Sequence, residues 1–152
     1  MLELEYRQLL SILRKVIEDD YQIPAELFAE EVNWKRLYEH AVMHDLAGWL
    51  YPGTKELAVP ENVTQIYKTA YLKSVRKEAI VHVELTAYMQ ELEKNGIAYA
   101  PLKGWFLKEL YPSPELRTMT DVDLLVKAED FEAACKLLES RDFVLDTVTT
   151  YH

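Results

Sequence analysis

Apolar positions recur at helical spacing through the N-terminal half of the chain. Over residues 2–17 they are three and four positions apart, which predicts an amphipathic helix with one apolar stripe. The stripe consists of Leu2, Tyr6, Leu9, Leu10, Leu13, Val16 and Ile17. We therefore expect this face of the first helix to point toward the core.

A second helical pattern covers residues 34–50. Asn33 precedes it, and we expect its side chain to cap the helix by accepting from a free backbone N–H group. The residues expected to be buried are Leu37, Ala41, Val42 and Leu46. Tyr51, Pro52 and Gly53 follow, and this combination is typical of a turn that ends a helix.

A third pattern begins at Pro60 and keeps the helical period, without glycine or proline, as far as Asn95 and Gly96. A glycine just beyond the last periodic residue is typical of a helix end. The predicted helix is unusually long, so the pattern is compatible with an unbroken helix and also with a bent or broken one.

The pattern changes after Gly96, where short apolar runs alternate with turn-forming residues. The expected elements are a strand over 97–102, a helix over 105–110, a proline-bearing loop over 111–120, a strand over 121–126, a helix over 131–140 capped by Asp130, and a strand over 143–151. Such alternation indicates a small sheet with flanking helices.

The predicted fold class is therefore α+β, a mixed α/β arrangement. Residues 1–95 are expected to form a helical part, packed on a small mixed sheet that residues 96–152 supply. The break near Gly96 is the one boundary that the pattern indicates, and we expect the two parts to form one compact unit.

Composition and charge exclude several classes of protein. The 152 residues are 49% hydrophobic and 28% charged, which is typical of a folded globular chain. A formal net charge of -9 has the wrong sign for a broad nucleic-acid-binding surface, because such surfaces neutralise phosphates with Lys and Arg. The single cysteine, Cys135, has no partner for an internal disulfide and is expected to be buried. The sequence has neither a signal peptide nor a membrane-spanning run, so we expect a cytoplasmic protein without membrane contact.

Asp121 and Asp123 are separated by one residue at the start of an apolar run. Side chains alternate along a strand, so both carboxylates are expected on one face, with Cα atoms roughly 6.6 Å apart. Magnesium usually takes one or two carboxylates together with substrate phosphates, so the spacing favours a site for Mg²⁺ or Mn²⁺. A structural role, with Asp121 in a turn and Asp123 in an ion pair, is the alternative. Leu124 and the apolar residues after it put Asp123 at the edge of a core, where we expect a cation to meet it.

Lys103 and Gly104 stand where the first predicted strand ends and a helix begins. Free N–H groups at such a position favour phosphate, glycine permits close approach, and lysine adds a positive charge. A glycine that only eases the turn is the structural alternative. Arg117, four residues before Asp121, is close enough in sequence to contact a triphosphate or to neutralise the carboxylates. A solvated loop arginine explains it equally well.

The motifs LKG, YPSPELR and TDVDLLV, in this order and spacing, resemble the uncharacterised nucleotidyltransferase family of the polymerase-beta-like superfamily. The likeness covers residues 97–152 well and the helical part, with its AVMHDLAGWLY stretch, more loosely. It implies a nucleotidyltransferase-type core with Gly104 in the phosphate-binding turn and Asp121 and Asp123 as the first two metal-binding acids. The superfamily usually builds this turn as Gly-Gly or Gly-Ser, whereas here Lys103 precedes the glycine and Trp105 follows it.

Enzymes similar to this one bring a third carboxylate from a later strand. Asp146 is the only acid in the last predicted strand and is a poor substitute. We therefore expect the third ligand to lie beyond His152. On this interpretation the chain is an N-terminal piece of a longer protein and holds the first half of the core.

The resemblance implies a metal-dependent nucleotidyltransferase, which transfers a nucleoside monophosphate from an NTP to an acceptor hydroxyl and releases pyrophosphate. Asp121 and Asp123 would be catalytic and bind Mg²⁺, and Lys103, Gly104 and Arg117 would bind the nucleotide. The acceptor stays open between a small molecule, a protein and an RNA. The alternative is a non-catalytic nucleotide-binding or protein-interaction module that retains the fold.

Overall fold

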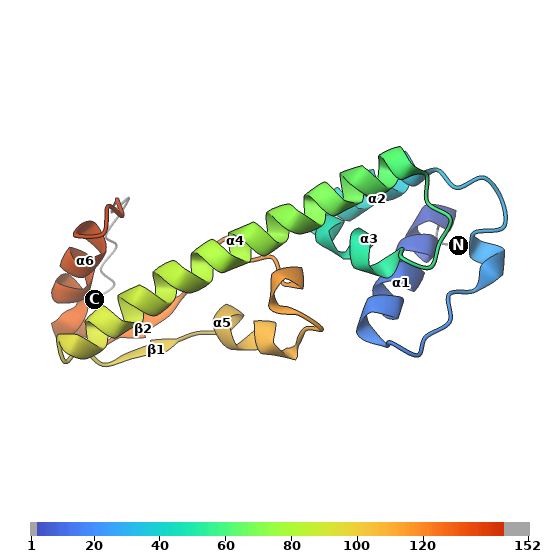
Figure 1. The fold of residues 1–152 in the computed structure, drawn as a ribbon. Helices are drawn as coiled ribbons and strands as arrows, with labels where there is room; N and C mark the ends of the chain where they lie inside the picture. The colour runs from blue at the N-terminus through green and yellow to red at the C-terminus, as the bar shows by residue number, and fades with distance from the viewer. Residues whose placement is uncertain (1–2, 145–152) are drawn as a thin grey trace. The chain divides into compact units, whose positions relative to one another are not determined.

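The computed structural model describes residues 3–144, which form six α-helices and one pair of β-strands (Figure 1). The helices are α1 (Leu4–Ile17), α2 (Trp34–Met43), α3 (Ala47–Gly53), α4 (Glu61–Lys94), α5 (Gly104–Leu107) and α6 (Phe131–Glu139). The strands are β1 (Tyr99–Pro101) and β2 (Leu124–Val126), and 3-10 turns lie at Ala25–Leu27, Lys108–Leu110, Pro114–Leu116 and Ala128–Asp130. These elements confirm the predicted α+β class. None of the described helices combines the length and apolar character needed to cross a bilayer.

Contacts between residues divide the chain into two units. Unit 1 consists of Met1–Glu78 and Leu107–Met119, and unit 2 of Ala79–Phe106 and Thr120–His152. The division falls inside α4, which contributes its first part to unit 1 and its last part to unit 2. These units differ from the predicted parts at 1–95 and 96–152, because the segment after α5 packs with the N-terminal helices.

Unit 1 has one apolar core between α1, α2, α3 and the first part of α4. Its buried residues are Leu9, Ile12, Leu37, Ala41, Leu50 and Tyr67. The predicted stripe of the first helix is partly wrong, because Leu10 is 54% and Ile17 61% exposed. Leu9 and Ile12 are on the face of α1 that points to the core. Leu10 and Ile17 are on the neighbouring face of the helix, which is exposed. The expected burial of Val42 is also wrong, since this residue is 50% exposed.

The helix predicted over 34–50 is two helices, α2 and α3. Asp45 stands between them with a φ of +57°. The N–H groups of Asp45 and Leu46 donate to the carbonyls of Val42 and Ala41, at 3.1 and 2.7 Å. This pair of bonds around a left-handed residue is a Schellman motif, which ends α2 and starts α3 in a new direction. Glycine usually occupies the left-handed position, and here aspartate does.

A helix cap was predicted at Asn33, before α2, and a turn was predicted at residues 51–53, where α3 ends. The cap is confirmed, because Oδ1 of Asn33 accepts a 3.1 Å hydrogen bond from the N–H of Arg36. The predicted turn is wrong, because Pro52 and Gly53 belong to α3. Gly53 is buried, and a Cβ added there would lie 2.6 Å from Cγ2 of Ile12. The glycine is therefore needed for close packing of α3 against α1.

α4 is a single helix of 34 residues, so the broken alternative does not occur. Gly96, with a φ of +70°, follows its end. The N–H groups of Gly96 and Ile97 donate to the carbonyls of Glu93 and Leu92, at 3.0 and 2.9 Å, in a second Schellman motif. The helix end predicted at Asn95 and Gly96 is thus confirmed.

Unit 2 contains the two-stranded sheet of the described residues. β1 and β2 are antiparallel, with Tyr99 opposite Val126 and Pro101 opposite Leu124. Both strands are shorter than the predicted ranges 97–102 and 121–126. The core of this unit contains buried residues of α4 and α6 and Ile97, which precedes β1: Leu85, Tyr88, Leu92, Ile97 and Ala134.

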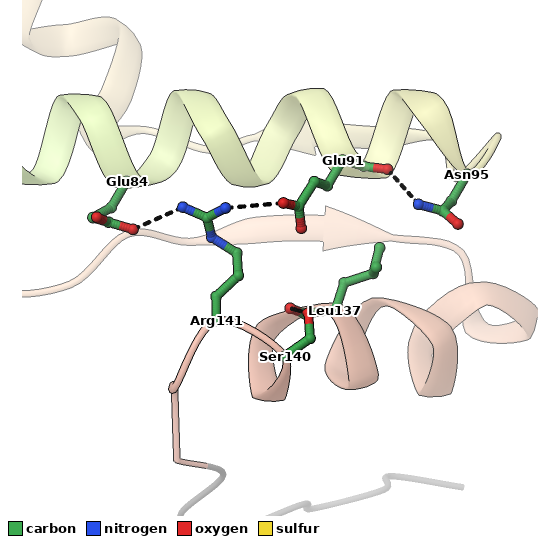
Figure 2. A network of polar contacts seen from close by, with 6 residues as sticks. All are labelled: Glu84, Glu91, Asn95, Leu137, Ser140 and Arg141. Carbon is green, nitrogen blue, oxygen red and sulfur yellow. Dashed lines mark hydrogen bonds and ion pairs between the residues drawn. The ribbon is translucent and has the colours of Figure 1, made fainter.

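Arg141 connects the residues after α6 to α4 (Figure 2). Its terminal guanidinium nitrogens donate to Oε2 of Glu84 and Oε1 of Glu91, each at 2.9 Å. These hydrogen bonds, that to Glu84 first, raise the pKa of Arg141. One arginine therefore holds two acids of the long helix, which fixes the end of α6 against α4 in unit 2.

Among the elements predicted after residue 130, the helix is present and its cap is not. The helix predicted over 131–140 is confirmed as α6, but the side chain of Asp130 makes no capping hydrogen bond. The turn Ala128–Asp130 leads into the helix instead. The strand predicted over 143–151 falls largely outside the described residues, and Phe143 and Val144, which are described, are not in a strand. Cys135 is half-buried rather than buried.

Candidate metal and phosphate site

Side chains from Asp121 to Val126 alternate between exposed and half-buried. The half-buried residues, Val122, Leu124 and Val126, all pack against the core of unit 2. Because side chains alternate along an extended chain, Asp121 and Asp123 lie on the opposite, exposed face. Regular β structure begins only at Leu124, so the aspartates precede β2 instead of starting the strand.

The pairing of β1 with β2 continues one residue beyond the strands. The N–H of Leu102 donates to the carbonyl of Asp123 at 2.9 Å, which extends the register set by Pro101 and Leu124. The chain then turns at Lys103 and enters α5 at Gly104. The turn and the aspartate pair therefore lie at the same end of the strand pair, on neighbouring chain segments.

Lys103 has the unusual backbone conformation in this turn. Its φ is +27°, in a region that non-glycine residues rarely adopt. Strain of this kind persists where the surrounding structure imposes it, and it is often found at functional sites. Nothing in the sequence indicated it. α5 has only four residues, so its dipole is small, and a phosphate here would depend on the lysine ammonium and on free N–H groups.

Trp105, directly after Gly104, is anchored within unit 2. Its ring stacks on His82 of α4 with centroids 5.2 Å apart and an interplanar angle of 24°. Trp105 also packs against the apolar core. These contacts of Trp105 therefore fix the start of α5. His82 lies within the long predicted helix, and its sequence spacing does not indicate this contact with Trp105.

Both aspartates are exposed, and no lysine or arginine among residues 3–144 forms an ion pair with either one. The hydroxyl of Thr120 donates to Oδ1 of Asp121 at 3.3 Å. Asp123 is exposed, so water can solvate its carboxylate, and the cation expected to meet it stays a prediction. Two such charges about 6 Å apart repel by roughly 0.7 kcal/mol in water, and a bound cation would relieve that repulsion.

Two unpaired carboxylates on one surface fit a Mg²⁺ ion in number and in chemistry. Across the described range 3–144, no group of three or more His, Cys, Asp or Glu side chains could hold a metal ion. A metal held by Asp121 and Asp123 would take its other ligands from phosphates, water or other residues. Asp146, the poor substitute for a third acid, lies outside the described residues.

Arg117 is separated from the other predicted residues by the division into units. Lys103, Gly104, Asp121 and Asp123 all belong to unit 2, and Arg117 belongs to unit 1. There the guanidinium carbon of Arg117 lies 5.7 Å from the centre of the Tyr111 ring. Its Nε is buried without a hydrogen-bond partner in the described structure. Lys103, Gly104 and the two aspartates therefore belong to one unit. Arg117 belongs to the other unit and contacts Tyr111 there.

Residues 30–152 match a family model of the nucleotidyltransferase class. The model describes the uncharacterised nucleotidyltransferase family, and since the match covers most of the chain, the chain belongs to that family. The resemblance found from the three motifs is confirmed. No curated protein and no solved structure has significant similarity to the chain. Family membership implies a nucleotide as the class of substrate.

Proposed function

We propose that this chain provides the metal- and phosphate-binding part of a nucleotidyltransferase. An acceptor hydroxyl oxygen forms a bond to the α-phosphorus of an NTP, and the bond from that phosphorus to the bridging oxygen of pyrophosphate breaks. The hydroxyl proton passes to water or to a base. One observation supports the proposal most directly. Asp121 and Asp123 are exposed, form no ion pair with the described residues and lie beside the turn at Lys103, in a chain of this family.

Each residue has a distinct proposed role. Asp121 and Asp123 hold Mg²⁺ or Mn²⁺, which when bound screens the phosphate charge and aligns the displacement. Lys103 and the N–H groups from Gly104 onward contact the β- and γ-phosphates. Arg117 is proposed as a supporting cation for the nucleotide. The acceptor is a small molecule, a protein hydroxyl or an RNA end, and we expect the reaction in the cytoplasm.

The test is transfer of label from α-³²P-labelled NTPs, incubated with the full-length protein, Mg²⁺ and a cell extract. We expect labelled product from the wild type and a loss of at least 100-fold in the double variant Asp121→Asn, Asp123→Asn, because a metal-binding charge pair is removed. Asp19→Asn with Asp20→Asn is the matched control, since both residues are exposed acids in unit 1 and the change in net charge is the same.

Other results would separate the alternatives. Equal labelling by the wild type and by the Asp121, Asp123 double variant would overturn the catalytic role of the pair. Metal-dependent NTP binding without labelled product would favour the non-catalytic nucleotide-binding module. Binding without any need for metal would overturn the assignment of the aspartates as ligands.

A further inference from the structure

Unit 1 contains a hollow that Lys103, Gly104, Asp121 and Asp123 do not line. Its volume is about 450 Å³, which lies within the range of small-molecule sites. Trp49 and Leu116 line it and are only 5% and 4% exposed, whereas Ile17 and Leu110, which also line it, are 61% and 80% exposed. The hollow therefore has a buried apolar floor and an apolar rim open to water.

Arg117 lines this hollow and forms no ion pair with any of the described residues. Nε of Arg117 is buried and has no hydrogen bond in the part of the chain that the structure describes. The nearby contact of its guanidinium is with the Tyr111 ring, 5.7 Å from Cζ to the ring centre. Asp45 lines the same hollow but forms no ion pair with Arg117. A buried N–H group without an acceptor is costly, so the site favours an acceptor from outside the chain.

The segment that carries Arg117 is held in place before any ligand binds. The indole N–H of Trp49 donates to the carbonyl of Leu116 at 2.8 Å, and the hydroxyl of Tyr71 donates to Oε1 of Glu115 at 2.7 Å. Both bonds come from other elements of unit 1 and meet the two residues before the arginine. A site held in this way loses little conformational entropy when a ligand binds.

We propose that this hollow binds a small organic monocarboxylate with an apolar body of about the size of one aromatic ring. The planar guanidinium of Arg117 matches a carboxylate, while Trp49, Leu116 and Tyr111 contact the apolar body. Asp45 repels a second negative charge, so the site selects a carboxylate over a phosphate dianion. The proposal does not rest on nucleotidyl transfer by the residues of unit 2, and it gives Arg117 a carboxylate ligand in place of the supporting role toward the nucleotide.

The test uses phenylacetate as the probe and the ¹H–¹⁵N signal of the Trp49 indole as the reporter, which Trp49→Phe identifies by its disappearance. We expect a saturable shift at millimolar phenylacetate. Phenylacetamide has the same shape without the charge, and acetate has the charge without the ring. Each is expected to bind at least tenfold more weakly, because charged hydrogen bonds and a buried ring both contribute.

Two pairs of variants locate the site. Arg117→Met should weaken phenylacetate binding at least tenfold, whereas Arg7→Met, at an exposed arginine of α1, should leave it unchanged. Leu110 is on the exposed rim, so Leu110→Glu tests the hollow without disturbing the core. It should weaken binding through charge repulsion, and Leu110→Gln should not. The proposal is overturned if phenylacetate and phenylacetamide bind equally, if no saturable shift occurs up to about 50 mM, or if both Arg117→Met and Leu110→Glu bind like the wild type.

Discussion

The indole N–H of Trp49 in α3 donates a buried hydrogen bond of 2.8 Å to the backbone carbonyl of Leu116. The two residues are far apart in sequence, and this bond holds the segment Leu107–Met119 in unit 1. The ring of Trp49 also meets the edge of Tyr111, with centroids 5.9 Å apart. Together with the hydrogen bond from Tyr71 to Glu115, Trp49 therefore joins the segment after α5 to the helical unit.

Replacing Trp49 with Phe should destabilise unit 1 by roughly 2 kcal/mol, because the buried carbonyl of Leu116 loses its donor and the smaller ring leaves space. The measurement is chemical denaturation followed by circular dichroism. Trp34→Phe is the control, since Trp34 is half-buried and its indole N–H makes no hydrogen bond among the described residues. Equal losses from the two substitutions would contradict this role of the bond.

The two buried glycines of α3 should respond differently to alanine. A Cβ at Gly53 would lie 2.8 Å from the backbone carbonyl of Ile12, which cannot move alone, so Gly53→Ala should cost about 1 to 3 kcal/mol. A Cβ at Gly48 would lie 2.7 Å from the hydroxyl of Ser74, which can rotate away. Gly48→Ala should therefore cost clearly less. A comparison of the two melting temperatures decides, and a larger loss at Gly48 would refute the explanation.

Replacing Asp142 with Gly should stabilise the protein by up to about 1 kcal/mol. Asp142 has a φ of +64°, and the N–H groups of Asp142 and Phe143 donate to the carbonyls of Glu139 and Leu138 in a third Schellman motif. Asp142→Asn makes the same change in charge and keeps a tolerated left-handed residue, so its effect should be close to zero. Asp142→Ala should not stabilise. If alanine and glycine raise the melting temperature equally, strain at this position is not the cause.

The aspartate pair should be dispensable for folding and necessary for ligand-dependent stability. Without metal, Asp121→Asn with Asp123→Asn should leave stability unchanged or raise it by a few tenths of a kcal/mol, because exposed like charges are removed. With Mg²⁺ and an NTP at 100 times its Kd, the wild type should gain about 2.7 kcal/mol. The double variant should lose this gain, and Asp19→Asn with Asp20→Asn should keep it. A large loss of stability without metal would instead indicate a structural role for the pair.

The local pattern was sufficient for the class of fold and for much of the candidate site. Helical period predicted α1 and the long α4, and the Asn33 cap and the Gly96 end followed from side-chain chemistry that acts within one turn. The spacing of Asp121 and Asp123 indicated one common face, because alternation along an extended chain is a property of the backbone itself. Interactions between near neighbours determine each of these features.

Helix ends formed by aspartate were not predictable in the same way. Asp45 and Asp142 both adopt the left-handed conformation that ends a helix. Aspartate adopts this conformation only occasionally, so its presence in the sequence does not predict a helix end. At Asp45, the residue that follows, Leu46, packs against the core of unit 1, and this contact is between segments that the local pattern does not relate. Periodicity alone therefore joined α2 and α3 into one helix.

The sequence by itself determined the α+β class, the family and the aspartate pair beside a lysine–glycine turn, because short-range spacing carries all of them. Only the tertiary structure decided that Leu107–Met119 joins the helical unit, that Arg117 lines a hollow with Tyr111 and Trp49, and that Lys103 takes the strained conformation of the turn. These features depend on contacts such as that of Trp49 with Leu116. No local spacing encodes such contacts, since they form only when distant segments bury apolar surface together.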